Sequence, residues 1–138
     1  MSKQAWVFPG QGSQFLGMLS ELAAEYPTIE KTFSVASEVL GYDLWDVVNN
    51  DEQKLSQTQV TQPALLAASY AIFNILQENN ASLPDYMAGH SLGEYSALVC
   101  AGVIDFKDAI RLVEARGQFM QQAVPQGVGA ENSYYAYS

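Results

Sequence analysis

Two short apolar runs, each followed at once by a glycine-rich turn, mark the predicted strands. Residues 5–8 form the first run, which ends at Pro9 and leads into the turn at 10–14. Residues 86–88 form the second run, directly before the glycine-rich sequence 89–93. Apolar runs of this length bounded by glycine are typical of strands rather than of helices. The first run predicts a buried strand and the second a brief one.

Between these strands the apolar residues recur at helical spacing. After Pro27, steps of four, three and four residues predict one helix, with Thr28 as its N-cap and Gly41 at its C-terminal end. A second helix is predicted to open at Pro63, because proline fits the first turn. Residues 49–62 are polar and predict mainly loop. The stripes are Ile29, Phe33, Ala36 and Leu40, and then Leu65, Ser69, Ile72 and Leu76.

Two more helices are predicted after the second strand. Residues 94–101 are apolar enough for a buried helix, which Gly102 ends. Asp105 and Asp108 have the spacing of an N-cap and a third residue in the last helix. Its apolar positions are Ile110, Val113, Gly117 and Met120. Strand–turn–helix units of this kind predict an α/β layered fold with a parallel sheet and flanking helices.

Composition narrows the classes of function. A length of 138 residues predicts one compact domain, without a membrane span or a secretion signal. A net charge of −9, from 15 acidic and 6 basic residues, argues against nucleic acid and anionic membranes as partners. An anionic substrate would need one local cation, or basic surface outside this sequence. The single cysteine, Cys100, favours a reducing cytoplasm and is expected to be buried.

The run 89–93 carries the candidate chemistry. Its Gly-x-Ser-x-Gly pattern places Ser91 on a sharp turn, with the hydroxyl at the mouth of a site. Because a helix follows, the Leu92 N–H is the expected oxyanion donor. The plainer alternative is a glycine-rich turn without chemistry. His90, the only histidine, is expected to face away from Ser91, so these residues do not supply a general base.

Four stretches in order carry a family resemblance. They are FPGQGSQ at 8–14, TQPALL at 61–66, GHSLGE at 89–94 and the run to Arg116-Gly117. Together they resemble the malonyl-CoA:acyl-carrier-protein transacylases of bacterial fatty-acid synthesis, and the acyltransferase domains of polyketide and fatty-acid synthases. The resemblance covers about residues 4–130.

The resemblance implies a role for each site residue. Ser91 would become malonylated, and Gln11 with the Leu92 N–H would hold the oxyanion. Arg116 would pair with the free malonyl carboxylate, since a planar guanidinium fits a carboxylate. An acetyl group has no such carboxylate and would leave the guanidinium unpaired, which disfavours acetyl groups. Gln62 would line the pocket. The implied substrate is malonyl-CoA. The implied partner is acyl carrier protein, which carries the phosphopantetheine. The resemblance implies no metal and no resident cofactor.

When the family resemblance is set aside, the residues themselves leave plainer interpretations open. Gln11 and Gln62 would be surface or capping residues, and Arg116 a solvated helix residue paired with Glu114 or Asp108. A serine esterase or thioesterase with the same turn is an alternative function. A truncated, non-catalytic fragment is another.

The resemblance also implies parts that this sequence lacks. Residues 1–130 correspond to the first part of a hydrolase-like large subdomain. The general-base histidine, a ferredoxin-like small subdomain and the closing strands are expected downstream, so this chain alone is expected to be inactive, and the full-length protein monomeric. Residues 131–138, with three tyrosines in eight positions, are predicted to be an atypical tail, either artefactual or natural.

Overall fold

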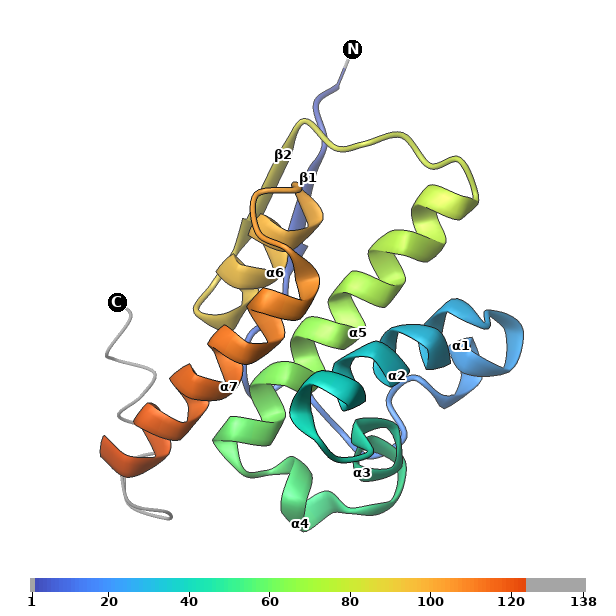
Figure 1. The fold of residues 1–138 in the computed structure, drawn as a ribbon. Helices are drawn as coiled ribbons and strands as arrows, with labels where there is room; N and C mark the ends of the chain where they lie inside the picture. The colour runs from blue at the N-terminus through green and yellow to red at the C-terminus, as the bar shows by residue number, and fades with distance from the viewer. Residues whose placement is uncertain (1, 124–138) are drawn as a thin grey trace.

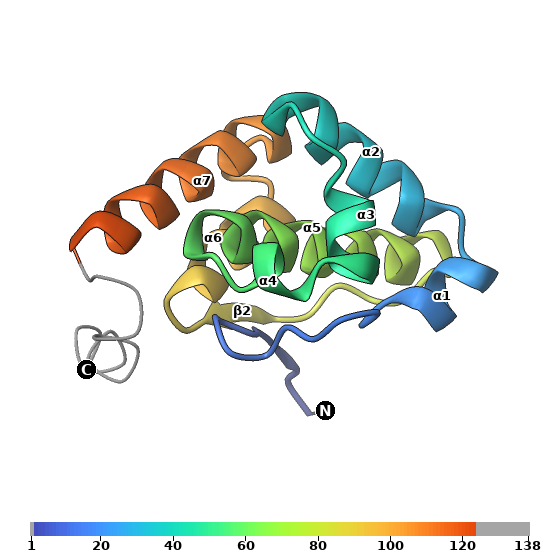
Figure 2. The ribbon, with the colours of Figure 1, turned by 90° about the horizontal axis from the view of Figure 1, so that it is seen from below.

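The computed structural model describes residues 2–123 as helices and a small sheet arranged around one long helix. The strands are β1 (Ala5–Phe8) and β2 (Tyr86–Gly89). The helices are α1 (Ser20–Glu25), α2 (Thr28–Leu40), α3 (Leu44–Asn50), α4 (Glu52–Leu55), α5 (Thr58–Glu78), α6 (Leu92–Cys100) and α7 (Phe106–Ala123). Figure 1 shows α5 running through the middle of the molecule. In Figure 2 the strands lie on one side of α5, and α2 and α7 lie on the other.

The two strands occur where the sequence predicts them and pair in parallel. Ala5 is opposite Tyr86, and Phe8 is opposite Gly89. The expected burial of the first strand holds only for Phe8, which is 8% exposed, whereas Val7 is 76% exposed and Trp6 is half-buried. Successive side chains of a strand point to opposite faces. Within residues 2–123, the packed helices bury only the Phe8 end of one face.

The core forms where α2, α6 and α7 pack against α5. Most of α5 is buried, and residues 60–69 are buried on every side of the helix. The same core cluster includes buried apolar side chains of α2, α3 and α7: Ile29, Phe33, Ala36, Leu44, Val47, Val48, Phe106, Ala109, Ile110 and Val113. The helices therefore form a layer that covers one face of the sheet. Within the described residues, no helix is both long and apolar enough to cross a membrane.

The region from 49 to 62 differs most from its prediction. It contains α4 and the first residues of α5 in place of a loop. Polar residues start both helices here: the Asp51 carboxylate accepts a hydrogen bond from the Lys54 N–H at 3.0 Å, which caps α4. Pro63 accordingly lies inside α5 and does not open it. Caps of this kind supply hydrogen bonds that an apolar stripe does not reveal.

Helix α2 ends as predicted but begins differently. Gly41 adopts φ 85° at its C-terminal end. Its N-cap is Pro27, and Thr28 is the first helical residue. The Thr28 hydroxyl donates to the Glu78 carboxylate at 2.6 Å instead of capping. This hydrogen bond joins the start of α2 to the end of α5.

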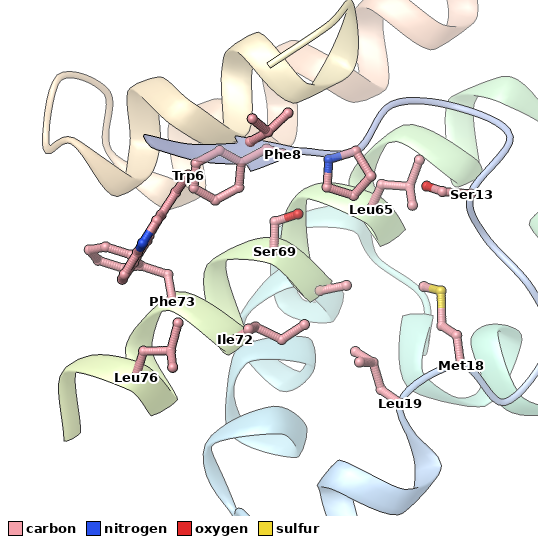
Figure 3. A pocket seen from close by; sticks show the side chains of 13 residues that line it. Trp6, Phe8, Ser13, Met18, Leu19, Leu65, Ser69, Ile72, Phe73 and Leu76 are labelled. Carbon is pink, nitrogen blue, oxygen red and sulfur yellow. The ribbon is translucent and has the colours of Figure 1, made fainter. Parts of the chain in front are cut away.

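The predicted buried stripe of α5 is correct only in its first half. Leu65 and Ser69 are buried, whereas Ile72 and Leu76 are each 37% exposed. These last two side chains line an apolar cavity of about 430 Å³ between α5 and β1, shown in Figure 3. Trp6 contributes its indole to the same cavity. The second half of the predicted stripe therefore lines an open cavity in place of packed core.

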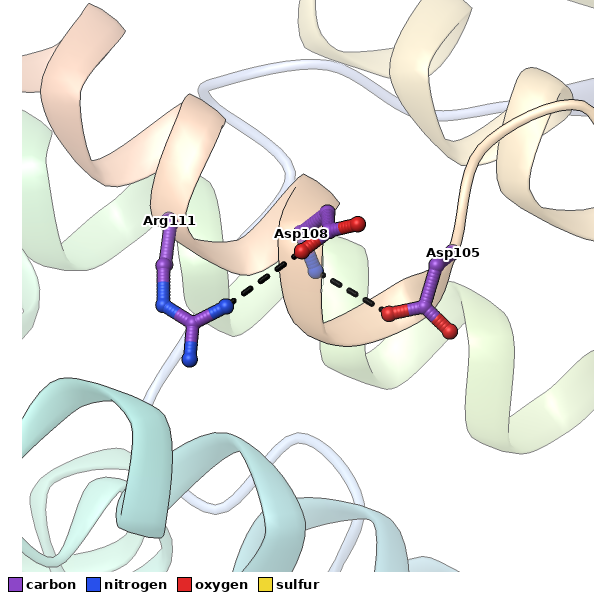
Figure 4. Close-up of polar contacts among 3 residues, drawn as sticks. All are labelled: Asp105, Asp108 and Arg111. Carbon is purple, nitrogen blue, oxygen red and sulfur yellow. Dashed lines mark hydrogen bonds and ion pairs between the residues drawn. The ribbon is translucent and has the colours of Figure 1, made fainter.

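Helix α7 begins with the predicted cap. The Asp105 carboxylate accepts a hydrogen bond from the Asp108 N–H at 3.3 Å (Figure 4). Arg111 forms an ion pair with Asp108 at 3.3 Å, with both side chains well exposed. The segment predicted as a tail, 131–138, lies outside the described residues, as does the domain boundary predicted at 130.

Candidate active site

Ser91 joins the last residue of β2 to the first turn of α6, and its backbone is strained. It adopts φ 60° and ψ −117°, a conformation rarely found outside glycine. Such a residue costs of order 1–3 kcal/mol and persists only where its surroundings hold it in place. A strand–turn–helix with a serine at the turn is the arrangement that exposes a nucleophilic hydroxyl. The structure therefore forms the sharp turn that residues 89–93 predict.

The two glycines of this turn allow backbones to touch. A Cβ added to Gly89 would lie 2.0 Å from the carbonyl carbon of Gly93. A Cβ added to Gly93 would lie 2.2 Å from the carbonyl oxygen of Phe8. Real Cβ atoms do not approach other heavy atoms so closely. Strand β1, strand β2 and the start of α6 are thus fixed against one another through these two positions.

Two helices, α5 and α7, contribute the side chains that connect to Ser91 through hydrogen bonds. The Arg116 Nη2 of α7 donates a hydrogen bond to Ser91 Oγ at 3.1 Å. Its Nη1 donates to Gln62 Oε1 of α5 at 3.0 Å. Gln62 Nε2 in turn donates to the Met120 sulfur at 3.0 Å. The structure therefore brings together Ser91, Arg116 and Gln62, which the sequence analysis had selected.

The plainer interpretations of Gln62 and Arg116 are wrong. Gln62 is fully buried, so it is neither a surface nor a capping residue. Arg116 is half-buried, and its proposed partners are used otherwise. The Asp108 carboxylate forms its ion pair with Arg111, not with Arg116. Burial raises the pKa of Glu114. The Arg116 guanidinium donates hydrogen bonds to Ser91 and Gln62.

Gln11 and Leu92 lie on different segments beside the site, the turn after β1 and the start of α6. Gln11 is exposed, and its Nε2 donates to the Thr58 hydroxyl at 3.4 Å, at the start of α5. The preceding Gly10 touches the turn of Ser91, because a Cβ there would lie 2.8 Å from the backbone oxygen of the adjacent His90. Leu92 is the first residue of α6, so its N–H has no acceptor within the helix. Oxyanion binding by both residues stays a prediction.

His90 contributes its backbone to the turn. Its carbonyl oxygen accepts a hydrogen bond from the Gly93 N–H at 3.1 Å, and the residue is exposed. This bond closes the turn around Ser91. The expected orientation of the imidazole, away from the serine hydroxyl, stays a prediction.

Two residues near α7 have raised pKa values. Burial, together with the nearby Glu114 carboxylate, raises the pKa of Tyr42 to about 12. The Lys54 ammonium lies 4.1 Å from the centre of the Tyr42 ring. The Tyr42 phenol is therefore a packed, protonated group at neutral pH.

Cys100 carries a thiol, which is a potential nucleophile, and its surroundings suppress the reactivity of this thiol. It is 7% exposed and packs with Phe8 and Ala97. Burial raises the pKa of its thiol to about 12. Since the thiolate is the reactive form, Cys100 is inert near neutral pH. This confirms the expectation of a buried cysteine.

Alkylation should reveal this suppression. We expect native Cys100 to react with iodoacetamide at least about a hundredfold more slowly at about pH 8 than Cys100 in the urea-unfolded chain, since little thiolate forms when the pKa is raised. The rates are measured by mass spectrometry of the intact protein. Equal rates in the folded and unfolded chains would contradict the burial.

Comparison with known proteins agrees with this geometry. The sequence profile of the acyl transferase domain family matches residues 5–134. The chain belongs to the acyl transferase family. Among curated relatives of this family, the malonyl CoA-acyl carrier protein transacylase of Escherichia coli (strain K12) is 60% identical over 131 residues, which are 94% of this chain. That of Haemophilus influenzae is 62% identical over 132 residues, again 94% of this chain. The chain spans 42% of the length of both relatives.

Solved acyl transferase structures have the same fold. An acyl carrier protein S-malonyltransferase from Vibrio cholerae superposes with a TM-score of 0.88 at 64% identity, covering 91% of this chain and 42% of that one. A malonyl-transacylase solved in complex with a type II polyketide-synthase acyl-carrier protein gives the same TM-score and identity, covering 91% of this chain and 41% of that one. The α/β class predicted from the sequence is confirmed, for the part of the fold that this chain contains.

Proposed function

We propose that this chain supplies the acyl-accepting part of a transferase that moves a malonyl group from malonyl-CoA to acyl carrier protein. Ser91 Oγ attacks the thioester carbon, the CoA thiol leaves, and a malonyl-serine ester forms. The phosphopantetheine thiol of acyl carrier protein then attacks this ester and frees Ser91. A cytoplasmic location, where the free Cys100 thiol stays reduced, belongs to the same proposal.

The observation that carries this proposal is the hydrogen bond from Arg116 to Ser91. It places a permanent cation 3.1 Å from the hydroxyl that would carry the acyl group. The chain has a net charge of −9, so recognition of an anionic substrate needs such a local cation. A malonyl group ends in a carboxylate, and a guanidinium can hold a carboxylate through two parallel hydrogen bonds.

The start of α6 supplies the electrostatic part. The Leu92 N–H, at the positive end of the helix, is placed beside Ser91 to receive the oxyanion of the tetrahedral intermediate. Gln11 is the second proposed donor, on the turn that touches Ser91. The serine proton needs a base, and the proposal assigns this role to a histidine beyond these residues.

Labelling tests the proposal directly. The protein is incubated with radiolabelled malonyl-CoA and digested, and the labelled peptide is identified. The same experiment uses a chimaera in which residues 1–130 replace the matching segment of the 60%-identical E. coli relative, which supplies the rest of that enzyme. Label is expected on Ser91 of the chimaera. An active chimaera labelled elsewhere would contradict the proposal.

Arg116→Ala should separate a malonyl transferase from a hydrolase. In the chimaera we expect kcat/KM for malonyl-CoA to fall by about a hundred- to a thousandfold, because the substrate carboxylate loses its buried partner. The rate with acetyl-CoA should stay the same or rise. Arg111→Ala, which removes an exposed arginine of the same helix, is the matched control and should change neither rate by more than about twofold. A serine esterase would keep its rate with uncharged esters and lose nothing with malonyl-CoA.

A further inference from the structure

We propose that Tyr95 is a positioning residue for Arg116, and that it thereby sets the preference for malonyl over acetyl groups. The Arg116 Cζ lies 5.4 Å from the centre of the Tyr95 ring. A guanidinium within about 6 Å of an aromatic ring gains a cation–π attraction. The effect on acyl preference rests on the proposed function, whereas the contact itself does not.

Tyr95 lies in the first turn of α6, the helix that follows Ser91 directly. Ser91 is the N-cap residue of this helix. The ring and the serine hydroxyl are therefore fixed relative to each other by α6, while Arg116 comes from α7. The contacts of the guanidinium with Ser91 Oγ, with Gln62 Oε1 and with the ring together position the end of this long side chain relative to the nucleophile.

The ring matters most when Ser91 is acylated. The Arg116 Nη2 donates to Ser91 Oγ, and this oxygen becomes part of an ester in the proposed intermediate. An ester oxygen is a poorer acceptor than a hydroxyl, so this contact weakens at that stage. The hydrogen bond to Gln62 and the contact with the Tyr95 ring do not involve the reacting atoms. These two contacts would hold the guanidinium while it binds the malonyl carboxylate.

Both partners are also neutral. A carboxylate in place of Gln62 or Tyr95 would compete with the malonyl carboxylate for the same donors. The ring attracts the guanidinium through its π-electrons and presents no negatively charged group to it. Ordering an arginine side chain otherwise costs rotamer entropy when the substrate binds. A ring that orders it beforehand lowers that cost for malonyl groups only.

Nuclear magnetic resonance on the intact chain tests the contact. The sequence has two arginines, Arg111 and Arg116, so the side-chain Nε–Hε spectrum contains the test group and one exposed reference. In Tyr95→Leu we expect the Arg116 side chain to lose order in ¹⁵N relaxation while Arg111 stays unchanged. Tyr95→Phe, which keeps the ring, should restore the order. Unchanged order of Arg116 in Tyr95→Leu would overturn the proposal.

A measurement without substitution covers the case in which Tyr95→Leu does not fold. In the unmodified chain, the Arg116 side-chain protons should be shifted upfield by the ring and show nuclear Overhauser contacts to Tyr95. The absence of both would overturn the proposal.

Acyl preference is measured in the chimaera. A cation–π contact of about 0.5–2 kcal/mol predicts that Tyr95→Leu lowers the malonyl-to-acetyl ratio of kcat/KM by about 2- to 30-fold, with Tyr95→Phe near the unmodified ratio. Label on Ser91 with an unchanged ratio would overturn the selectivity role and leave the proposed function intact. An active unmodified chimaera without label on Ser91 would overturn the proposed function, together with the selectivity role, but not the measured ring contact.

Discussion

Ser91→Ala in the chimaera is expected to lower kcat/KM for malonyl transfer by at least about 10³-fold and to leave no malonylated peptide. The substitution removes the only atom to which the acyl group attaches in the proposed mechanism. Arg116 and Gln62 remain, so binding of malonyl-CoA should persist while transfer stops. Transfer is followed with radiolabelled malonyl-CoA and acyl carrier protein.

Ser96→Ala is the matched control for this loss. Ser96 belongs to the same helix and is fully buried, and its hydroxyl has no hydrogen-bond partner within the described residues. Its removal should leave transfer within about twofold, since no hydrogen bond is lost. A Ser91→Ala protein that still transfers malonyl groups at a comparable rate would exclude a covalent serine intermediate.

Gly93→Ala is expected to destabilise the fold by about 3 kcal/mol or more, because the new methyl group would overlap backbone that cannot move alone. The added carbon would lie 2.2 Å from the Phe8 carbonyl oxygen and 3.0 Å from its carbonyl carbon. Strand β1 would have to separate from the start of α6. The free energy of unfolding is measured by urea titration followed by circular dichroism.

Gly102→Ala provides the comparison. Gly102 has φ 81°, but a Cβ there would meet nothing within 4 Å. Its replacement should cost about 1–2 kcal/mol from backbone strain alone. Equal losses at Gly102 and Gly93 would show that the overlap with Phe8 is relieved by small shifts, and that the close approach is not required.

Local patterns predicted the parts of the fold whose cause is local. The strands predicted at residues 5–8 and 86–88, the end of α2 at Gly41 and the cap at Asp105 all follow from neighbours in sequence. The start of α5 was missed for the opposite reason. Thr61 is a polar residue that is fully buried because its hydroxyl donates to the backbone oxygens of Leu55 and Gln57. A pattern that counts polar residues as exposed assigns such a segment to a loop.

The site shows the same division. The Gly-x-Ser-x-Gly pattern alone predicted the turn and Ser91 as its candidate nucleophile, because both depend on adjacent residues. Arg116 and Gln62 were selected only through the family resemblance, since residues 54 positions apart carry no local sign of their contact. Tyr95 and Met120 were missed as site residues. Their apolar surfaces resemble those of core residues, and only the helix packing shows that they hold Arg116 and Gln62.

Helices α5 and α7 approach each other at a glycine beside the site. A Cβ added to Gly117, the residue after Arg116, would lie 2.6 Å from the Cα of Gln59 and 2.7 Å from the Thr58 oxygen. The separation of the guanidinium from the Gln62 amide is thus fixed by main chain meeting main chain. The spacing of Arg116 and Gln62 is consequently set by a helix crossing, so under the proposed function redesign for bulkier acyl groups would have to begin at that crossing as well as at these two side chains.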